Sequence, residues 1–316
     1  MKCINLKSVS KKSYEMTDVL NNASISFESS AIHVVLSSNA ESLFCLLKVI
    51  SGLDTVMSGK IYIDEADVTA KHARDRGVAV IFKQSTLYPN MTVLENIKSL
   101  MGVDRTIDTD RINYAVKLLK IEDILSEPAA ELSAYNRLMV LLAKAIIKQP
   151  KAILIEEALQ DVLTEDKNSV KSALKTVQKA LDCVILCTTV KNDGILDLAE
   201  KLTIIEDGVV LQSGEVREVL SVPKNVHVAQ ILGSPQFHFY DGSIKNTKDG
   251  AYFCYYSDSS IKLRVPDELV EKAAPDILKE DVVLCIEESK AKKIAQYPQS
   301  GTLYLFNKSS GKNIAL

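Results

Sequence analysis

Adjacent carboxylates provide the most direct candidate for chemistry in this sequence. Glu156 and Glu157 follow residues 152–155, an apolar run with the length and composition of a buried strand. A carboxylate at the end of a strand can act as a general base on a bound substrate. Paired carboxylates also occur where a buried strand simply leaves the core and meets solvent. The residues by themselves leave both interpretations open.

Cysteine and histidine spacing does not indicate a metal site. The chain has six cysteines but no CxxC pair and no HExxH spacing, so neither a disulfide framework nor a zinc site is expected. Buried reduced thiols are the simplest interpretation of these cysteines. The histidines are expected to be packed or surface residues; they are His33, His72, His227 and His238. We therefore predict no metal ligands.

Composition excludes several functional classes. The 316 residues, 47% of them hydrophobic, are enough for about two folded domains. Lys and Arg total 38 against 41 Asp and Glu, so the chain lacks the basic field that holds nucleic acid. No apolar run reaches the roughly 18 residues of a membrane span, and the first twelve residues lack the apolar block of a secretory signal. A folded cytoplasmic protein is expected.

Short apolar runs alternate with helical patterns, which predicts a mostly parallel α/β sheet. These runs are residues 32–36, 77–82, 152–155, 183–187, 202–205 and 209–212. The pattern changes at Gly233-Ser234-Pro235, beyond which the strand-like stretches are residues 252–256, 261–265, 282–286 and 302–306. The change predicts a boundary near residue 235 between an α/β domain and a small β domain.

Several segments resemble one family in the correct order along the chain. ISGLD at 50–54 and SGKIYI at 58–63 resemble the stretch after the phosphate loop of ATP-binding-cassette (ABC) ATPases. RGVAVIFKQSTLYPNMTVLENI at 76–97 resembles the Q-loop region of sugar-importer ATPases, and this match is long and specific. LFNKSSGK at 305–312 resembles the end of the β-rich domain in maltose-type importer ATPases.

The resemblance implies an α/β fold, namely an ABC-type nucleotide-binding domain with the P-loop NTPase fold and a helical subdomain. A small β-rich, OB-like regulatory domain would follow. The implied limits are 1–234 for the nucleotide-binding domain, about 90–150 for its helical subdomain, and 235–316 for a shortened regulatory domain. The family also implies a dimer, with another ABC subunit or with itself, docked on the membrane-spanning subunits of a carbohydrate importer. Such a subunit is peripheral on the inner face of the cell membrane.

The phosphate loop that the resemblance places at residues 37–45 lacks the residue types that bind phosphate and Mg²⁺. A phosphate loop needs glycines for close backbone approach, a lysine for the phosphate charge and a hydroxyl for Mg²⁺. The family's GPSGCGKST aligns with SSNAESLFC, in which Leu43 replaces the lysine and Phe44 replaces the Mg²⁺ hydroxyl. The other positions of this vestigial Walker A motif that we assign to the site are Ser37, Ser42 and Cys45.

The remaining motifs depart from the family in the same way. Glu156 and Glu157 take the Walker B positions of the Mg²⁺ aspartate and the water-activating glutamate, and Thr189 takes the place of the H-loop histidine. Lys83 replaces the Q-loop glutamine; it either reaches a phosphate or is a solvated loop charge. Tyr14 either stacks on adenine or packs. The vestigial signature sequence comprises Ser133, Ala134, Tyr135 and Asn136.

Residues 87–97 match the family better than the catalytic motifs do. The resemblance assigns Leu87, Tyr88, Pro89 and Met91 to the groove that receives a helix of a membrane subunit. Alternatively, the apolar members of this segment cover the subdomain core.

The motif losses predict a degenerate cassette: a pseudo-ATPase that serves a carbohydrate importer as a structural or regulatory subunit and needs no cofactor. One alternative is a subunit of an asymmetric sugar transporter that retains weak binding of ATP and Mg²⁺. Another is a cytoplasmic interaction protein that acts away from any transporter. No nucleic-acid partner is expected.

Overall fold

The computed structural model describes residues 2–102, 108–159, 161–192, 194–233, 237–257, 262–272, 281–287 and 303–314. The chain divides into two compact units, Met1–Ser213 and Gly214–Leu316. Within the described ranges, every helix is too short or too polar to cross a membrane.

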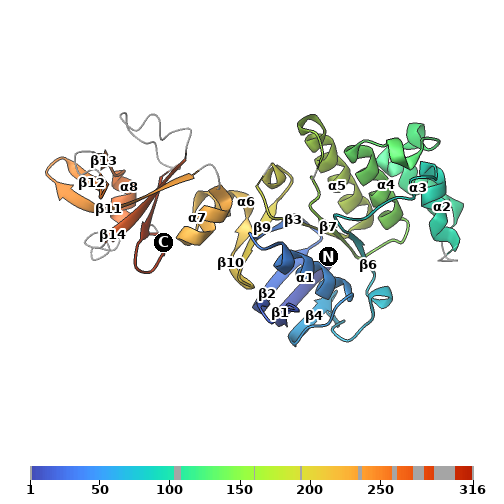
Figure 1. The fold of residues 1–316 in the computed structure, drawn as a ribbon, viewed down its shortest axis with the longest axis horizontal. Helices are drawn as coiled ribbons and strands as arrows, with labels where there is room; N and C mark the ends of the chain where they lie inside the picture. The colour runs from blue at the N-terminus through green and yellow to red at the C-terminus, as the bar shows by residue number, and fades with distance from the viewer. Residues whose placement is uncertain are drawn as a thin grey trace. The chain divides into compact units, whose positions relative to one another are not determined.

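A six-stranded sheet organises the first unit, with the strand order β10-β9-β3-β8-β7-β6 (Figure 1). Its strands are β3 (Ile32–Leu36), β6 (Val78–Ile81), β7 (Ala152–Glu156), β8 (Val184–Thr189), β9 (Lys201–Glu206) and β10 (Val209–Glu215). The pairs from β9 through β6 are parallel, which confirms the mostly parallel sheet expected from the sequence. Every residue of β3 and β8 is buried, so their near-continuous apolar sequences fit a sheet covered on both faces.

A smaller antiparallel sheet, ordered β2-β1-β4-β5, belongs to the same unit. Its strands are β1 (Cys3–Lys12), β2 (Asp18–Glu28), β4 (Ser58–Ile63) and β5 (Ala66–Asp67). Helix α1 (Ala40–Ser51) shares one hydrophobic core with both sheets, because this core contains residues of β1, β2 and β4 together with Val35, Leu154 and Leu186 of the larger sheet.

Both ends of α1 are fixed by specific polar contacts. The Asn39 side chain accepts from the N–H groups of Glu41 and Ser42, which caps the amino end. At the carboxyl end Gly52 adopts φ 79°, and a Cβ there would lie 2.5 Å from Nε of Arg76. The Arg76 side chain is buried and donates to the carbonyls of Val49, Ile50, Thr69 and Lys71 at 2.7–3.0 Å.

Among the described residues of the first unit there are four further α-helices (Figure 1). They are α2 (Val93–Lys98), α3 (Thr109–Leu119), α4 (Ala134–Ile146) and α5 (Lys167–Leu181). Thr92 and Glu95 form a capping box that starts α2. Helix α4 contacts α2, α3 and α5, so α2 to α4 form a helical group within the expected subdomain range of about 90–150.

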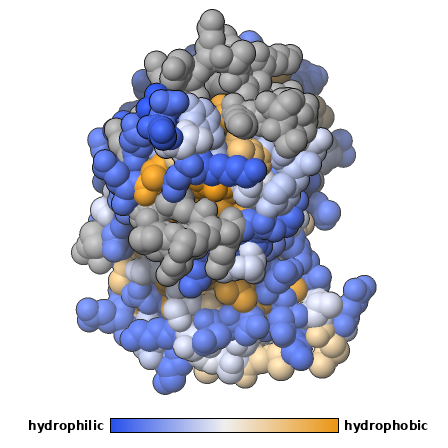
Figure 2. Space-filling view, turned by 90° about the vertical axis from the view of Figure 1, so that its left-hand side faces the viewer, coloured by the Kyte–Doolittle hydropathy of each residue, from blue (hydrophilic) through white to orange (hydrophobic). Residues whose placement is uncertain are grey.

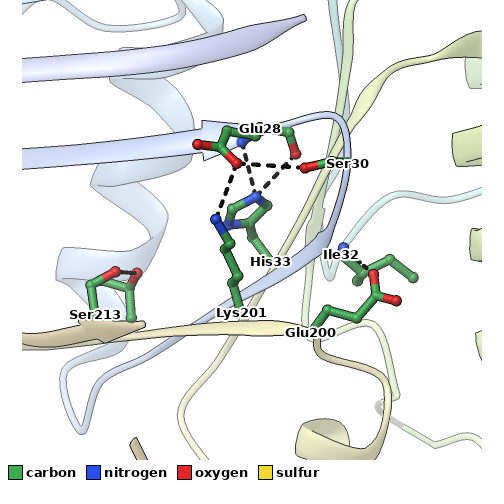
Figure 3. Close-up of polar contacts among 8 residues, drawn as sticks. Glu28, Ser30, Ile32, His33, Glu200, Lys201 and Ser213 are labelled. Atoms are coloured by element: carbon green, nitrogen blue, oxygen red, sulfur yellow. Dashed lines mark hydrogen bonds and ion pairs between the residues drawn. The ribbon is translucent and has the colours of Figure 1, made fainter. Parts of the chain in front are cut away.

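The amino ends of β3 and β9 carry a polar cluster at the edge of the sheet opposite the carboxyl strand ends (Figure 3). His33, only 2% exposed, accepts at Nε2 from the Glu28 N–H at 2.9 Å. Lys201 Nζ lies 3.0 Å from the Glu28 carboxylate, and the Glu200 carboxylate accepts from the Ile32 N–H at 3.0 Å. Burial lowers the pKa of His33 to about 4. His33 is therefore a packed residue, one of the two roles expected for it.

The second unit contains an antiparallel sheet with the order β13-β12-β11-β14-β15. Its described elements are α6 (Val216–Ser221), α7 (Val226–Gly233), β11 (Phe237–Thr247), β12 (Gly250–Tyr255), β13 (Lys262–Arg264), α8 (Asp267–Lys272), β14 (Asp281–Glu287) and β15 (Leu303–Asn307). The view in Figure 2 shows mainly hydrophilic residues, with hydrophobic residues in smaller areas.

The two units separate at Ser213, earlier than the boundary expected at residues 234 and 235, which lies outside the described residues. Helices α6 and α7 belong to the second unit because they pack on its sheet. The Tyr304 hydroxyl donates to the Leu220 carbonyl at 2.7 Å, and Ala229 shares a core with Phe306 of β15. This packing joins elements that are distant in sequence. The local residue pattern around the Gly-Ser-Pro stretch therefore does not indicate that α6 and α7 belong to the second unit.

Candidate functional site

Three of the segments expected to form a site meet at the carboxyl edge of the parallel sheet. The Ser37 N–H donates to the Thr189 carbonyl at 3.3 Å, and the Glu157 N–H donates to the Thr188 carbonyl at 2.9 Å. Because carboxyl ends of parallel strands meet at one edge, the loops after β3, β7 and β8 lie side by side. The structure thus brings together the residues aligned with Walker A, Walker B and the H-loop.

The loop between β3 and α1 already bonds its N–H groups to acceptors within the chain. Asn39 Oδ1 accepts from Glu41 N at 2.9 Å and from Ser42 N at 3.2 Å. The Ser38 N–H donates to the Glu206 carboxylate at 3.1 Å, and its hydroxyl bonds the same carboxylate. A phosphate at this helix end would need the donors that Asn39 occupies.

The side chains of this loop also differ from those that hold a nucleotide. Leu43 is 3% exposed and belongs to the hydrophobic core. The Phe44 ring packs 5.3 Å from the Phe82 ring, and Lys48 Nζ lies 5.3 Å from the Phe44 centroid. Burial raises the pKa of the Cys45 thiol to about 11. The residues therefore do not fit a Mg²⁺-bound triphosphate, because they provide neither the lysine nor the metal hydroxyl.

Both oxygens of the Glu157 carboxylate have partners. Oε1 accepts from the Val190 N–H at 3.0 Å, and Oε2 accepts from the Thr189 hydroxyl at 3.1 Å. Glu157 also has φ 52°, a left-handed conformation that is uncommon for a residue other than glycine. Glu156 accepts from the Lys83 N–H at 2.9 Å. The two carboxylates thus link neighbouring loops. These hydrogen bonds explain the position of Glu157 without a role as a general base.

A small cavity of about 170 Å³ lies beside these carboxylates. It is lined by Glu156 and Glu157, by the exposed Lys83, and by Arg137 and Ala134 of α4. Among the described residues, no group of three or more His, Cys, Asp or Glu is arranged to hold a metal.

The residues aligned with the signature sequence begin helix α4. The Ser133 hydroxyl accepts from the Asn136 N–H at 3.1 Å, so Ser133 caps the helix. Ala134, Tyr135 and Asn136 form the first turn, and burial raises the pKa of Tyr135. A local capping role accounts for Ser133. The family role of these four residues toward a second cassette stays a prediction.

A second, larger cleft of about 450 Å³ lies along α1, and sequence reasoning identified only part of it. Tyr14, which we expected near a base, lines it and is 97% exposed. Glu41, Phe44, Cys45 and Lys48 line it from one face of α1, at the i, i+3, i+4, i+7 spacing of a helical face. This spacing in the sequence could have placed Lys48 on the same face of the helix as Phe44.

The segment expected to contact a partner divides between core and surface. Leu87 is 7% exposed and belongs to the core, as the alternative interpretation held, whereas Tyr88 and Met91 are 56% and 38% exposed. Pro89 is also exposed. Lys144 Nζ lies 5.6 Å from the centroid of the Tyr88 ring.

Lys144 and Lys148 also line a neighbouring groove of about 320 Å³. Its walls are largely apolar, formed by residues that include Leu53, Val80, Phe82, Leu100 and Leu141.

Comparison with known proteins identifies similar chains. The ABC transporter family profile matches residues 20–160. The sn-glycerol-3-phosphate import ATP-binding protein UgpC 1 of Rhizobium johnstonii is 30% identical over 288 residues, which cover 90% of this chain and 76% of that protein. UgpC of Bartonella quintana is 28% identical over 279 residues, covering 87% and 80%.

Solved structures show the same fold at low sequence identity. The ADP conformation of MJ1267, an ATP-binding cassette of an ABC transporter, is 20% identical, with a TM-score of 0.61 and coverage of 73% of this chain and 98% of that one. CbiO1 of Clostridium perfringens, part of the ABC transporter complex cbiONQ, is 19% identical, with a TM-score of 0.62 and coverage of 68% and 89%.

These relatives overturn one expectation. From the lost phosphate-loop residues we expected no cofactor, and this expectation is wrong for a chain whose relatives are named ATP-binding proteins. The physical reason is that a phosphate loop is only one side of a nucleotide site, and the cleft along α1 is present beside it. With a 30% identical relative matched over 76% of its length and an ABC profile over residues 20–160, the chain belongs to the ABC transporter family of ATP-binding subunits.

Proposed function

We propose that the chain is an ATP-binding subunit of a carbohydrate importer that does not hydrolyse ATP. Its role in the complex is structural or regulatory. The relatives are named sn-glycerol-3-phosphate import ATP-binding proteins. These names support a role in an importer and ATP as the bound ligand. The single observation that carries the absence of hydrolysis is the packing at Leu43 and Phe44. Leu43 is in the core, and the Phe44 ring lies against Phe82.

Leu43 and Phe44 replace the lysine and the hydroxyl that neutralise phosphate charge in this family. Hydrolysis depends mainly on positioning and charge stabilisation by a lysine, a metal ion and a residue that orients water. Glu157 is the remaining candidate for orienting water, and its two oxygens accept from Val190 N–H and the Thr189 hydroxyl. Those bonds hold the carboxylate against the loop after β8, so a water would have to reach one of its remaining acceptor sites there.

The groove of about 320 Å³ supports docking on the membrane-spanning subunits. The exposed residues Tyr88 and Met91 follow closely in the sequence after Ser85, which lines this groove. An apolar groove of this kind can bind the apolar face of a helix. The subunit would then sit on the inner face of the cell membrane as a peripheral protein. It would pair with a competent ABC subunit or with a second copy of itself.

Phosphate release by the assembled transporter tests the absence of hydrolysis. The affinity-tagged chain is isolated in mild detergent from host membranes, and phosphate release with ATP and Mg²⁺ is compared with that of a Glu157→Gln variant. We expect equal rates, because Glu157 contributes no base. Release that depends on Mg²⁺ and falls by orders of magnitude in Glu157→Gln would overturn the proposal.

Recovery of membrane subunits in the same preparation tests docking. A Leu141→Asp change places a charge in the groove and should abolish their recovery. Leu163→Asp is the matched control, because Leu163 is 60% exposed and does not line the groove. A chain that recovers no membrane subunit even without substitution would instead act as an interaction protein away from a transporter.

A further inference from the structure

The groove of about 320 Å³ follows an edge of the six-stranded sheet. The strand order places β6 at the end of this sheet, where β7 is its one neighbour among the described strands. Five consecutive residues, Val78 to Phe82, line the groove, so it extends along the whole of β6. Ser51 at the end of α1 and Leu141 of α4 line it from other elements. The groove is therefore a place where a further chain segment could meet the sheet.

The backbone of β6 directs hydrogen-bonding groups into this groove. Along a strand, the N–H and C=O groups of successive residues point to opposite edges. The Gly77 carbonyl accepts from the Lys151 N–H at 2.7 Å, so the odd-numbered residues of this segment direct their backbone groups toward β7. The N–H and C=O groups of Val78 and Val80 therefore point to the open edge.

These groups of Val78 and Val80 have no partner within the described part of the chain. The next outward N–H, that of Phe82, donates to the Ser85 hydroxyl at 2.9 Å, which closes the edge beyond Val80. Val78 and Val80 are half-buried and pack against the core of the first unit. Two donors and two acceptors thus lie in the groove at a spacing of about 6.6 Å. A partner that excluded water from the groove would have to bond them.

A helix and an extended segment would meet these groups differently. The N–H and C=O groups along the side of a helix are bonded within that helix. A helix packed over β6 would therefore cover the backbone groups of Val78 and Val80 without bonding them. An extended segment has free N–H and C=O groups at the same spacing as a strand and can add to the edge of a sheet. The edge of β6 favours an extended occupant.

The charge of the groove specifies the chemistry of this occupant. Lys144 of α4 and Lys148 lie one helical turn apart in its lining, and no acidic residue is among the described lining residues. Neither lysine forms an ion pair with a described residue; the Lys144 ammonium group lies over the Tyr88 ring. Burial lowers the pKa of Lys144, and the charge of Lys148 lowers it further. A carboxylate from the occupant would stabilise both ammonium groups.

A second copy of this chain fits the groove less well than an acidic partner. Pairing of two β6 edges would bring the Lys144 and Lys148 side chains of both copies to one place, and like charges across paired strands are destabilising. Lysines beside an open edge are also a common protection against pairing between identical sheets.

We infer that the edge of β6 binds an extended, acidic segment of the partner as a seventh strand of the sheet, with a carboxylate of that segment at Lys144. The partner is a membrane-spanning subunit, and in this respect the inference rests on the proposed function. The backbone of the segment bonds the open groups of Val78 and Val80. Its alternate side chains lie against the apolar lining, which includes Leu53 and Leu141.

Peptides of defined sequence test strand addition on the full chain. The probe is a fluorescently labelled, end-capped heptapeptide of alternating valine and threonine with glutamate at its centre, and its binding is measured by fluorescence anisotropy. Two further versions carry N-methyl groups on the odd-numbered or on the even-numbered residues, so each version lacks the N–H groups of one edge. We expect one version to bind at least about tenfold more weakly and the other to bind like the probe, because a single edge of the peptide faces β6.

A change in β6 tests the same contact from the side of the protein. Val80→Pro removes an N–H that points to the open edge and leaves the pairing with β7 in place, since proline is tolerated on edge strands. This variant should bind the probe several times more weakly. Val80→Thr keeps the N–H and is the matched control. The N-methylated peptides give the same information on the unsubstituted chain.

A change at Lys144 tests the role of charge. The probe should bind several times more tightly than a version with glutamine in place of its glutamate, because the carboxylate pairs with a partly buried ammonium group. Lys144→Gln should abolish this difference between the two peptides. Lys117→Gln, at an exposed lysine outside the groove, should leave the difference unchanged.

Three results would overturn the inference. They are absent binding at millimolar peptide, equal affinity of the two N-methylated versions, and a preference for glutamate that survives Lys144→Gln. Recovery of membrane subunits beside any of these results would leave the proposed docking standing. Conversely, strand addition of the peptide to a chain that recovers no membrane subunit would refute the proposed docking and not the strand addition.

Discussion

Replacement of Glu157 by alanine should destabilise the protein. A catalytic carboxylate that waits for substrate contributes little to folding, whereas a carboxylate that fastens a loop contributes its hydrogen bonds. Val190 N–H loses its acceptor in this variant, while the Thr189 hydroxyl can turn to the Lys191 carbonyl at 3.0 Å. One charge-assisted bond is worth roughly 1.5–3 kcal/mol, so the free energy of unfolding should fall by about 2 kcal/mol.

Thermal melting followed by circular dichroism measures this loss. About 2 kcal/mol corresponds to a drop of roughly 4–8 °C for a unit of this size. Glu157→Gln keeps an acceptor oxygen for Val190 and should lose less than half as much. The matched control is Glu165→Ala, a change at an exposed carboxylate. If Glu157→Ala melts at the same temperature as the unsubstituted chain, the structural role assigned to Glu157 is refuted.

Three further outcomes test the packing. Since burial lowers the pKa of His33 to about 4, the unfolded chain binds a proton between pH 6.5 and 4 that the folded chain does not, so stability should fall by roughly 3 kcal/mol as pH drops through this window. Urea unfolding of His33→Gln should lack this part of the pH dependence. Arg76→Ala leaves four backbone carbonyls without their donor and should cost at least about 3 kcal/mol in chemical denaturation, whereas exposed Arg74→Ala should cost almost nothing. Tyr304→Phe removes the bond to the Leu220 carbonyl and should cost about 1 kcal/mol by the same assay.

The central sheet could be predicted from the sequence because its parallel strands are buried on both faces. Strands β3, β7 and β8 therefore have nearly continuous apolar runs. Strands β1 and β2 left a weaker signal, since their burial alternates and their exposed positions carry lysine, serine and asparagine. Their pairing also requires contacts with β4, which no local pattern specifies.

The place of the candidate site could be predicted, but its internal bonding could not. Loops after parallel strands meet at one edge, so positions 37, 157 and 189 come together. The bond from Val190 N–H to Glu157 depends on how a loop 33 residues away is folded, and the charge sharing of Lys11 and Lys48 at Asp54 depends on three separate segments. Motif matching compares residue types position by position. It therefore predicts neither the hydrogen bond between the two loops nor the ion pairs that Lys11 and Lys48 share at Asp54.

The packing of α7 on the second sheet determines how the chain can be shortened. Val228, Ala229 and Leu232 are buried in this helix, at most 4% exposed. A truncation at residue 234, where the sequence changes character, would keep α7 and delete the sheet that α7 contacts. The apolar side of the helix would then be open to water, and the fragment should associate with itself or aggregate. A fragment ending at Ser213 contains neither α6 nor α7 and is the better choice for isolating the first unit.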